Sequence, residues 1–148
     1  MEIKTATIEN AKEVSRLLNE EFGKDYEPEH FTEEYVIDKI NDEKNGFLIA
    51  IEDGKIIGVV RYSIIDIDLA ELRTLSVSGE FKDKGIGVKL VETALEELKS
   101  RNVRKVVART KTEKIPMHTM IEAGFLPEAY LKEHFRKGVD IIQWRKFL

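Results

Sequence analysis

Residues 75–90 read LSVSGEFKDKGIGVKL, and this stretch decides the fold. It runs from an alternating segment through a glycine-containing loop into a pattern in which apolar residues recur on one helical stripe. Gly85 and Gly87 lack a Cβ atom, so the loop can turn several backbone N–H groups toward one point at the positive end of the helix dipole. An anion is the natural occupant of that point, and a phosphate or pyrophosphate fits it best.

Other uses of such a loop make different demands on the sequence. A dinucleotide-binding fingerprint needs a third glycine where Leu90 stands, and a P-loop needs G-x-x-x-x-G-K-[ST]; the sequence contains neither pattern. A tight turn with close helix packing would also use two glycines. That structural explanation, and nucleotide binding by a loop of another type, stay open as alternatives.

The apolar periodicity on both sides of the loop predicts a mixed α/β fold, with helices packed on one sheet. Strands are expected at residues 3–7, 47–51, 56–65, 72–77 and 103–108, and in a final hairpin over 130–147. Helices are expected at residues 11–22, 31–40 and 86–101, and after Pro116. A polar stretch at 25–29 separates the first two helices, and the whole of 1–148 is expected to form a single domain.

Composition excludes several classes of protein. The 148 residues include no cysteine, which rules out thiolate nucleophiles, thiolate zinc sites and disulfides. The N-terminus lacks a leader pattern and no apolar run is long enough to cross a bilayer, so we expect a cytoplasmic protein without membrane contact. The net charge of −4 argues against a nucleic-acid partner. His30 and His134 do not stand at metal-ligand spacing, so we expect no metal.

The charges are unevenly distributed along the chain. Residues 1–74 carry 9 basic and 18 acidic side chains, whereas residues 75–148 carry 15 basic and 10 acidic ones. The two halves would present opposite fields to a ligand between them. We therefore expect Asp66, Asp68 and Glu71, with the acids of the second helix, to form a negative mouth that attracts an ammonium group. Simple solvation of the surface is the alternative explanation of these charges.

The loop resembles motif A of the GNAT superfamily of acetyl-CoA-dependent N-acetyltransferases, which reads R/Q-x-x-G-x-G/A after an L-x-V strand. Here Lys82-x-x-Gly85-x-Gly87 follows Leu75-Ser76-Val77, with lysine at the position of the family's arginine or glutamine. The sequence EAGF at 122–125 is similar to the family's E-K-L-G-F. The resemblance covers nearly the whole chain. It implies a mixed, mostly antiparallel central sheet of about seven strands, with flanking helices, that splays between strands four and five.

The resemblance also implies a cofactor, its site and a partner. Acetyl-CoA would be the co-substrate, a small-molecule or peptide amine the acceptor, and a homodimer through the terminal hairpin the assembly. Loop amides would hold the CoA pyrophosphate, strand four would pair with pantetheine, and the Val77 N–H would polarise the thioester carbonyl. The cofactor-binding residues implied in this way are Leu75, Val77, Lys82, Asp83, Lys84, Gly85, Ile86, Gly87 and Val88.

Three residues are candidates for the proton transfers that acetylation of an amine needs. Glu71 stands fourteen residues before Gly85, an offset at which histone acetyltransferases of the superfamily carry a general-base glutamate. The family's tyrosine acid, four residues before the glycine of Gly-Phe, is replaced here by Met120, so His118 and Tyr130 are the substitutes. Each of the three has a structural alternative as a packed or solvent-facing side chain. The missing hydroxyl also keeps open a non-catalytic acyl-CoA-binding or sensing module.

Overall fold

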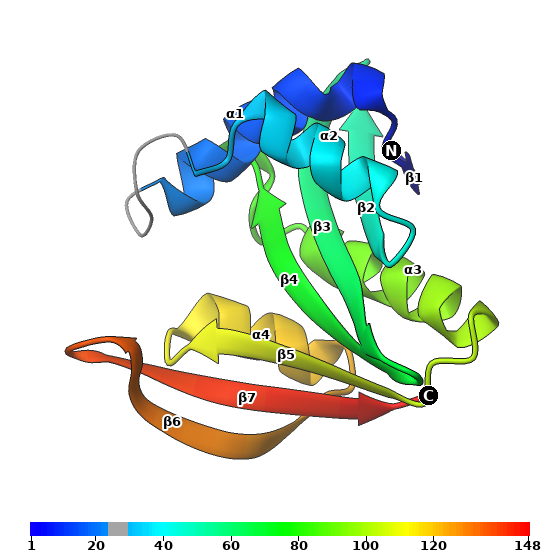
Figure 1. Cartoon of the computed structure of the whole chain (residues 1–148). Coiled ribbons are helices and arrows are strands. Elements are labelled where there is room, and N and C mark those ends of the chain that lie inside the picture. The colour runs from blue at the N-terminus through cyan, green and yellow to red at the C-terminus, as the bar shows by residue number, and fades with distance from the viewer. Residues whose placement is uncertain (24–29) are drawn as a thin grey trace.

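A computed structural model describes residues 1–23 and 30–148, so the polar stretch predicted at 25–29 lies outside the described residues. Within this part, seven strands form one sheet in the order β1-β2-β3-β4-β5-β7-β6 (Figure 1). The strands are β1 (Glu2–Thr5), β2 (Asn45–Glu52), β3 (Lys55–Asp66), β4 (Leu69–Val77), β5 (Lys105–Lys111), β6 (Leu126–Arg136) and β7 (Val139–Phe147). β4 and β5 run parallel, and the other neighbouring pairs are antiparallel. The predicted fold class is confirmed.

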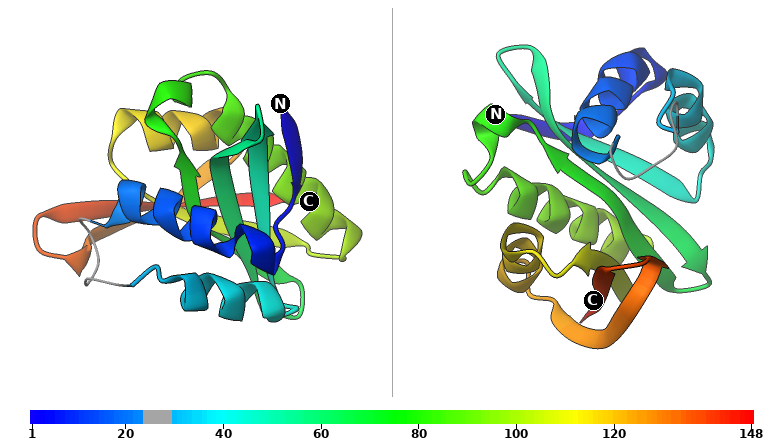
Figure 2. Two further views of the ribbon diagram at one scale, coloured as in Figure 1. Left: turned by 90° about the horizontal axis from the view of Figure 1, so that it is seen from above. Right: turned by 90° about the vertical axis from the view of Figure 1, so that its left-hand side faces the viewer.

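Helices cover both faces of the sheet (Figure 2). They are α1 (Ala11–Phe22), α2 (Glu33–Asn41), α3 (Ile86–Ser100) and α4 (Lys114–Glu122), with short 3-10 turns η1 (Ile8–Asn10) and η2 (Gly79–Phe81). α1 and α2 pack on one face through a cluster that includes Leu17 and Val36, while α3 and α4 pack on the other through a cluster that includes Leu90 and Met120. Both faces of the central strands are therefore buried.

β4 and β5 pair over only part of their lengths. Their ladder runs from Leu69 opposite Lys105 to Leu72 opposite Ala108, whereas β4 continues to Val77 and β5 to Lys111. Beyond the last pair the two strands diverge toward their carboxyl ends (Figure 1). The splay between strands four and five is thus present, and it opens a gap that faces the loop before α3.

A β-bulge in β4 accompanies this divergence. Tyr62 of β3 lies opposite Leu72 and Val60 lies opposite Leu75, so two residues of β4, 73 and 74, stand against a single residue of β3. An extra residue of this kind bends the strand that carries it and increases its twist. It also lets Leu72 and Leu75, three positions apart, both pack with the α3 cluster.

The structure differs from the prediction mainly at the ends of elements. β4 begins at Leu69 and β6 at Leu126, both several residues earlier than expected. The expectation that the fourth helix begins after Pro116 is wrong, because α4 starts at Lys114. Pro116 is the third residue of the helix, where the N–H that proline lacks would have no partner within the helix. The first bond of α4 runs from the Met117 N–H to the Glu113 carbonyl, at 3.2 Å.

Candidate functional site

The loop before α3 leaves the first-turn amides of that helix facing outward. Gly85 is the N-cap residue and has a left-handed backbone with φ of 76°, a conformation that favours glycine. The first bond within the helix runs from the Lys89 N–H to the Gly85 carbonyl, at 3.1 Å. The N–H groups of Ile86, Gly87 and Val88 precede that bond, and no side chain of the described residues caps the helix. These amides are the donors that an anion would accept.

Gly87 lies between β4 and α4. A Cβ atom built at this position would lie 3.7 Å from Leu75 Cδ2 and 3.7 Å from Thr119 Cγ2, which is ordinary van der Waals contact. Close packing of the helix therefore does not require glycine here, which weakens the purely structural explanation of the two glycines. A longer side chain at 87 would extend between β4 and α4.

Of the other predicted loop residues, Lys82, Asp83 and Lys84 are exposed and Val88 is half-buried, with one buried exception. Lys82 Nζ lies 2.8 Å from Glu21 Oε2 of α1, so its charge is already paired. Lys84 Nζ lies 5.1 Å from the centre of the Phe81 ring, and Asp83 has a left-handed φ of 62°. Ile86 is the exception, because its side chain is buried in the α3 cluster. Ile86 can offer a ligand only its backbone.

The backbone of β4 presents hydrogen-bonding groups to the gap. The Ser78 N–H donates to the Ile57 carbonyl of the β3 side at 2.8 Å. Because bonded and non-bonded pairs alternate along an antiparallel ladder, Ser76 also bonds to β3, and the N–H groups of Leu75 and Val77 point the opposite way. That direction is toward β5, where the two strands have separated. An amide-containing chain could pair with such an edge.

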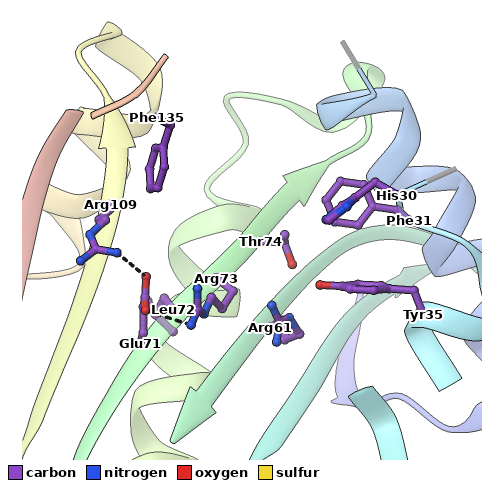
Figure 3. A pocket seen from close by; sticks show the side chains of 10 residues that line it. All are labelled: His30, Phe31, Tyr35, Arg61, Glu71, Leu72, Arg73, Thr74, Arg109 and Phe135. Carbon is purple, nitrogen blue, oxygen red and sulfur yellow. Dashed lines mark ion pairs between the residues drawn. The ribbon is translucent and has the colours of Figure 1, made fainter. Parts of the chain in front are cut away.

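A cavity of about 260 Å³ lies beside this gap (Figure 3). Its walls come from α2, from the segment just before it, and from four strands. The residues that line it are His30, Phe31, Tyr35, Arg61, Glu71, Leu72, Arg73, Thr74, Arg109 and Phe135.

Glu71 is the only carboxylate that lines this cavity among the described residues, and it is 7% exposed. Its Oε2 lies 3.3 Å from Arg73 Nη2 and its Oε1 lies 3.7 Å from Arg109 Nη1 (Figure 3). Arg109 is held from the far side, because its Nε donates to Gln143 Oε1 at 3.1 Å. Of the three predicted catalytic residues, Glu71 is thus the one that lines this cavity.

An aromatic wall faces Glu71 across the cavity. The Thr32 side chain caps α2 by accepting the Tyr35 N–H at 3.0 Å, and the Phe31 carbonyl accepts from Asn19 of α1 at 3.0 Å. The Tyr35 ring centre then lies 5.4 Å from that of His30 and 5.5 Å from that of Phe31. Sequence reasoning missed this wall. The signal that could have found it is the aromatic spacing at residues 30, 31 and 35, at the start of the second helix.

The predicted negative mouth is wrong. Among the described residues, three arginines and a single glutamate line the cavity, so the charges of these side chains sum to a positive value. Asp66 and Asp68 lie at the β3–β4 turn, outside the cavity lining, and Asp68 Oδ2 pairs with Arg104 Nε at 3.0 Å. The acidic balance of residues 1–74 does not describe the field inside this pocket.

His118 and Tyr130 do not join Glu71 in the cavity. His118 is 67% exposed at its side chain, and its Nε2 lies 2.7 Å from Glu122 Oε1. The Tyr130 hydroxyl donates to the Asp140 carboxylate, and this hydrogen bond raises the pKa of Tyr130 and makes it a poorer acid. Met120 is 4% exposed and packs in the α3 cluster. The proton-transfer roles of His118 and Tyr130 stay predictions that the geometry does not favour.

The described residues show two absences. No helix among residues 1–23 and 30–148 is both long and apolar enough to span a bilayer. Within the same part of the chain, no group of three or more histidine, aspartate and glutamate side chains could hold a metal ion.

Comparison with known proteins adds a family and a fold. The family model described as "Acetyltransferase (GNAT) family" matches residues 11–125. A protein of Chlorobaculum tepidum described as an uncharacterized N-acetyltransferase is 32% identical over 108 residues, which are 73% of this chain and 66% of that protein. The chain therefore spans slightly under two thirds of this curated relative.

Solved structures of acetyltransferases share the fold at low identity. A ribosomal-protein-alanine N-acetyltransferase from Brucella melitensis superposes with a TM-score of 0.86 at 18% identity, covering 100% of both chains. An aminoglycoside 6'-N-acetyltransferase complexed with coenzyme A superposes with a TM-score of 0.87 at 17% identity, covering 99% of this chain and 97% of that one. An N-acetyltransferase from Thermoplasma acidophilum in complex with coenzyme A superposes with a TM-score of 0.79 at 20% identity, covering 99% of this chain and 98% of that one.

Proposed function

The chain belongs to the acetyltransferase (GNAT) family, and we propose that it transfers an acetyl group from acetyl-CoA to a primary amine. The observation that carries this proposal is the continuity of two features. The outward-facing edge of β4 at Leu75 and Val77 is followed, after the loop 78–85, by the uncapped first turn of α3. A ligand with amide groups at one end and a pyrophosphate at the other matches that order of donors.

The residues present fit the phosphate end of CoA. The amides of Ile86, Gly87 and Val88 would hold the pyrophosphate, and the helix dipole favours negative charge there. Lys84 adds a full positive charge nearby, while Lys82 acts through its pairing with Glu21 to hold the loop against α1. Bound acetyl-CoA supplies an activated acyl group on a thiol leaving group.

The acceptor side is proposed to be the cavity that contains Glu71. In the step the amine nitrogen forms a C–N bond to the acetyl carbon, the C–S bond breaks, and the sulfur keeps the electron pair. The amine proton passes to the Glu71 carboxylate, directly or through one water. The Val77 N–H donates to the carbonyl oxygen as negative charge grows on it. Direct attack in a ternary complex needs no covalent enzyme intermediate.

The test combines binding and turnover. Coenzyme A, but not ATP, is expected to raise the melting temperature, because a ligand that binds the folded state stabilises it. Thiol release from acetyl-CoA should then depend on an added amine. If ATP stabilises the protein and CoA does not, the nucleotide-binding alternative replaces this proposal.

A non-catalytic acyl-CoA-binding or sensing module is the second candidate function. It is favoured by Met120, which is buried and brings no hydroxyl to the position where the family's tyrosine acid stands. Tight CoA binding without thiol release across a broad amine panel at high pH would select this candidate.

A further inference from the structure

We propose that the acceptor is an amino acid or a close relative: a small primary amine that carries a carboxylate and an apolar group. This inference rests on the proposed function and specifies its acceptor site. Glu71 would face the amine, the arginines of the cavity would hold the carboxylate, and the aromatic wall would cover the apolar group.

The arginines have more hydrogen-bonding capacity than Glu71 uses. A guanidinium carries five N–H donors in a planar fork that suits a carboxylate. Arg73 contacts Glu71 through Nη2, and Arg109 uses Nη1 for Glu71 and Nε for Gln143. Both side chains are partly open to solvent, at 42% and 34% exposure. One glutamate does not balance these charges, and a second carboxylate, brought by the ligand, would.

A buried hydroxyl gives an independent indication of a polar ligand. Thr74 is 9% exposed and lines the cavity, with its side chain directed into it (Figure 3). Its Oγ1 has no hydrogen-bond partner among the described residues. Leaving such a group unsatisfied costs about 1–3 kcal/mol, so a ligand that reaches it gains affinity. The bulge places Thr74 directly beside Arg73, on the wall that would receive the carboxylate.

The opposite wall suits an apolar group of limited size. His30, Phe31 and Tyr35 form one side, and Phe135 from β6 stands over the cavity although 62% of it is exposed (Figure 3). The volume of about 260 Å³ fits a small metabolite.

The same features act against polycationic acceptors. An aminoglycoside or a polyamine would bring several positive charges to a pocket that already holds three arginines. Juxtaposed like charges select against such partners. A peptide amine without a carboxylate nearby would bring no second anion to Arg73 and Arg109, which share Glu71.

The experiment compares matched acceptors at saturating acetyl-CoA. Phenylalanine and leucine are measured by thiol release beside their amides, the corresponding decarboxylated amines, a peptide amide and an aminoglycoside. The amides are the less basic amines, so a larger fraction of them is unprotonated at a given pH. A preference for the acids would therefore not come from a larger supply of free amine. We expect kcat/KM for the acids to exceed that for the other acceptors about tenfold or more, since the charged pairing is made only by the acids.

Variants identify the groups responsible. Arg73→Gln and Arg109→Gln should each lower the ratio of kcat/KM for acid over amide about tenfold, mainly through KM. The ratio is taken within each variant, because both arginines also contact Glu71 and their loss changes the rate with every acceptor. Arg109→Lys keeps the charge without the planar guanidinium and should retain part of the preference for acid over amide. It replaces Arg109→Gln as the test if the glutamine variant folds poorly. Arg16→Gln is the matched control, because Arg16 is an exposed arginine of α1 that pairs with Glu20.

The outcomes separate this inference from the proposed function. Equal or better use of the amides, amines, peptide or aminoglycoside would overturn the carboxylate site while leaving acetyl transfer intact. If no amine supports thiol release, titration of phenylalanine and its amide into the CoA-saturated protein decides. Binding of the acid alone supports the site, and equal binding or none overturns it.

Discussion

Glu71 and Arg109 pair across the point where β4 and β5 separate. Glu71 stands one residue before the last paired position of β4 and Arg109 one residue after that of β5, with 3.7 Å between Oε1 and Nη1. The carboxylate is thus held at the apex of the gap, between two strands whose paired parts are buried in the core. Its position depends on the splay of the sheet and not on a mobile loop.

Replacing Glu71 by glutamine should lower turnover without weakening CoA binding. The amide keeps the shape of the side chain but cannot accept a proton, and loss of a general base costs about 100-fold. The defect should be largest near neutral pH and shrink at high pH, where the free amine forms without help. Steady-state pH profiles measure it, with Glu20→Gln as the control because Glu20 is an exposed glutamate paired with Arg16. An unchanged profile would remove Glu71 from the mechanism.

Gly87→Glu should abolish CoA binding. The new carboxylate would extend between β4 and α4, beside the first-turn amides proposed to hold the pyrophosphate. Calorimetric titration is expected to show an affinity for CoA at least about 100-fold weaker, because a like charge enters the anion site. Thr93→Glu adds the same charge farther along α3 and should bind CoA normally. Retained micromolar affinity in Gly87→Glu would contradict the placement of the pyrophosphate.

A pair of proline variants tests the outward-facing edge of β4. Val77→Pro removes an N–H that points into the gap, so the sheet should survive while kcat falls about 100-fold, as for the loss of an oxyanion donor. Ser76→Pro removes an N–H that bonds to β3 and should lower the melting temperature much more. A folded Val77→Pro protein with full kcat would show that this amide has no role in the reaction.

Tyr62 predicts a loss of stability at alkaline pH. Its side chain is 1% exposed, and the hydroxyl donates to Glu97 Oε1 at 2.6 Å. Burial, reinforced by that hydrogen bond, raises the pKa of Tyr62 from 10.0 to about 12. The folded state binds this proton more tightly than the unfolded state. Its contribution is therefore complete below pH 10 and is lost as the pH rises from 10 toward 12.

Urea unfolding of the wild type and Tyr62→Phe at a series of pH values measures this effect. The free energy of unfolding of the wild type should fall on the order of 1–2 kcal/mol more than that of the variant across this window, because one pKa unit is about 1.4 kcal/mol and solvent screening reduces the total. Parallel slopes in the two proteins would show that Tyr62 titrates normally.

The order of elements and the loop could be predicted from the sequence because both depend on local patterns. Apolar periodicity marks the helices and strands, and left-handed turns call for glycine, as Gly85 shows with its φ of 76°. The β-bulge could not be predicted. Arg73 and Thr74 look like ordinary members of an alternating strand, and only pairing with β3 reveals that one of them is extra.

The pocket was predicted poorly because its residues are far apart in the chain. Phe31, Arg109 and Phe135 meet only when the segment before α2, β5 and β6 come together, and no local pattern connects them. The summed charge of residues 1–74 also led to a wrong prediction, the negative mouth, because it includes charges that lie away from the pocket. Asp68, for example, pairs with Arg104 at the opposite end of β4 from the proposed phosphate site. A half-chain total cannot report which charges converge.

The bulge at 73–74 also determines whether the sheet stays open. Deleting one of these two residues would restore a regular alternation against β3 without turning Leu75 or Val77 to the other face. The straightened strand would then be free to pair with β5 as far as Lys111, and the amides that now point outward would form hydrogen bonds to β5. A 147-residue version of this chain is thus expected to fold with a continuous, closed sheet that has no room for a thioester. Acetyl transfer by this fold would then depend on the one extra residue that forms the bulge at 73–74.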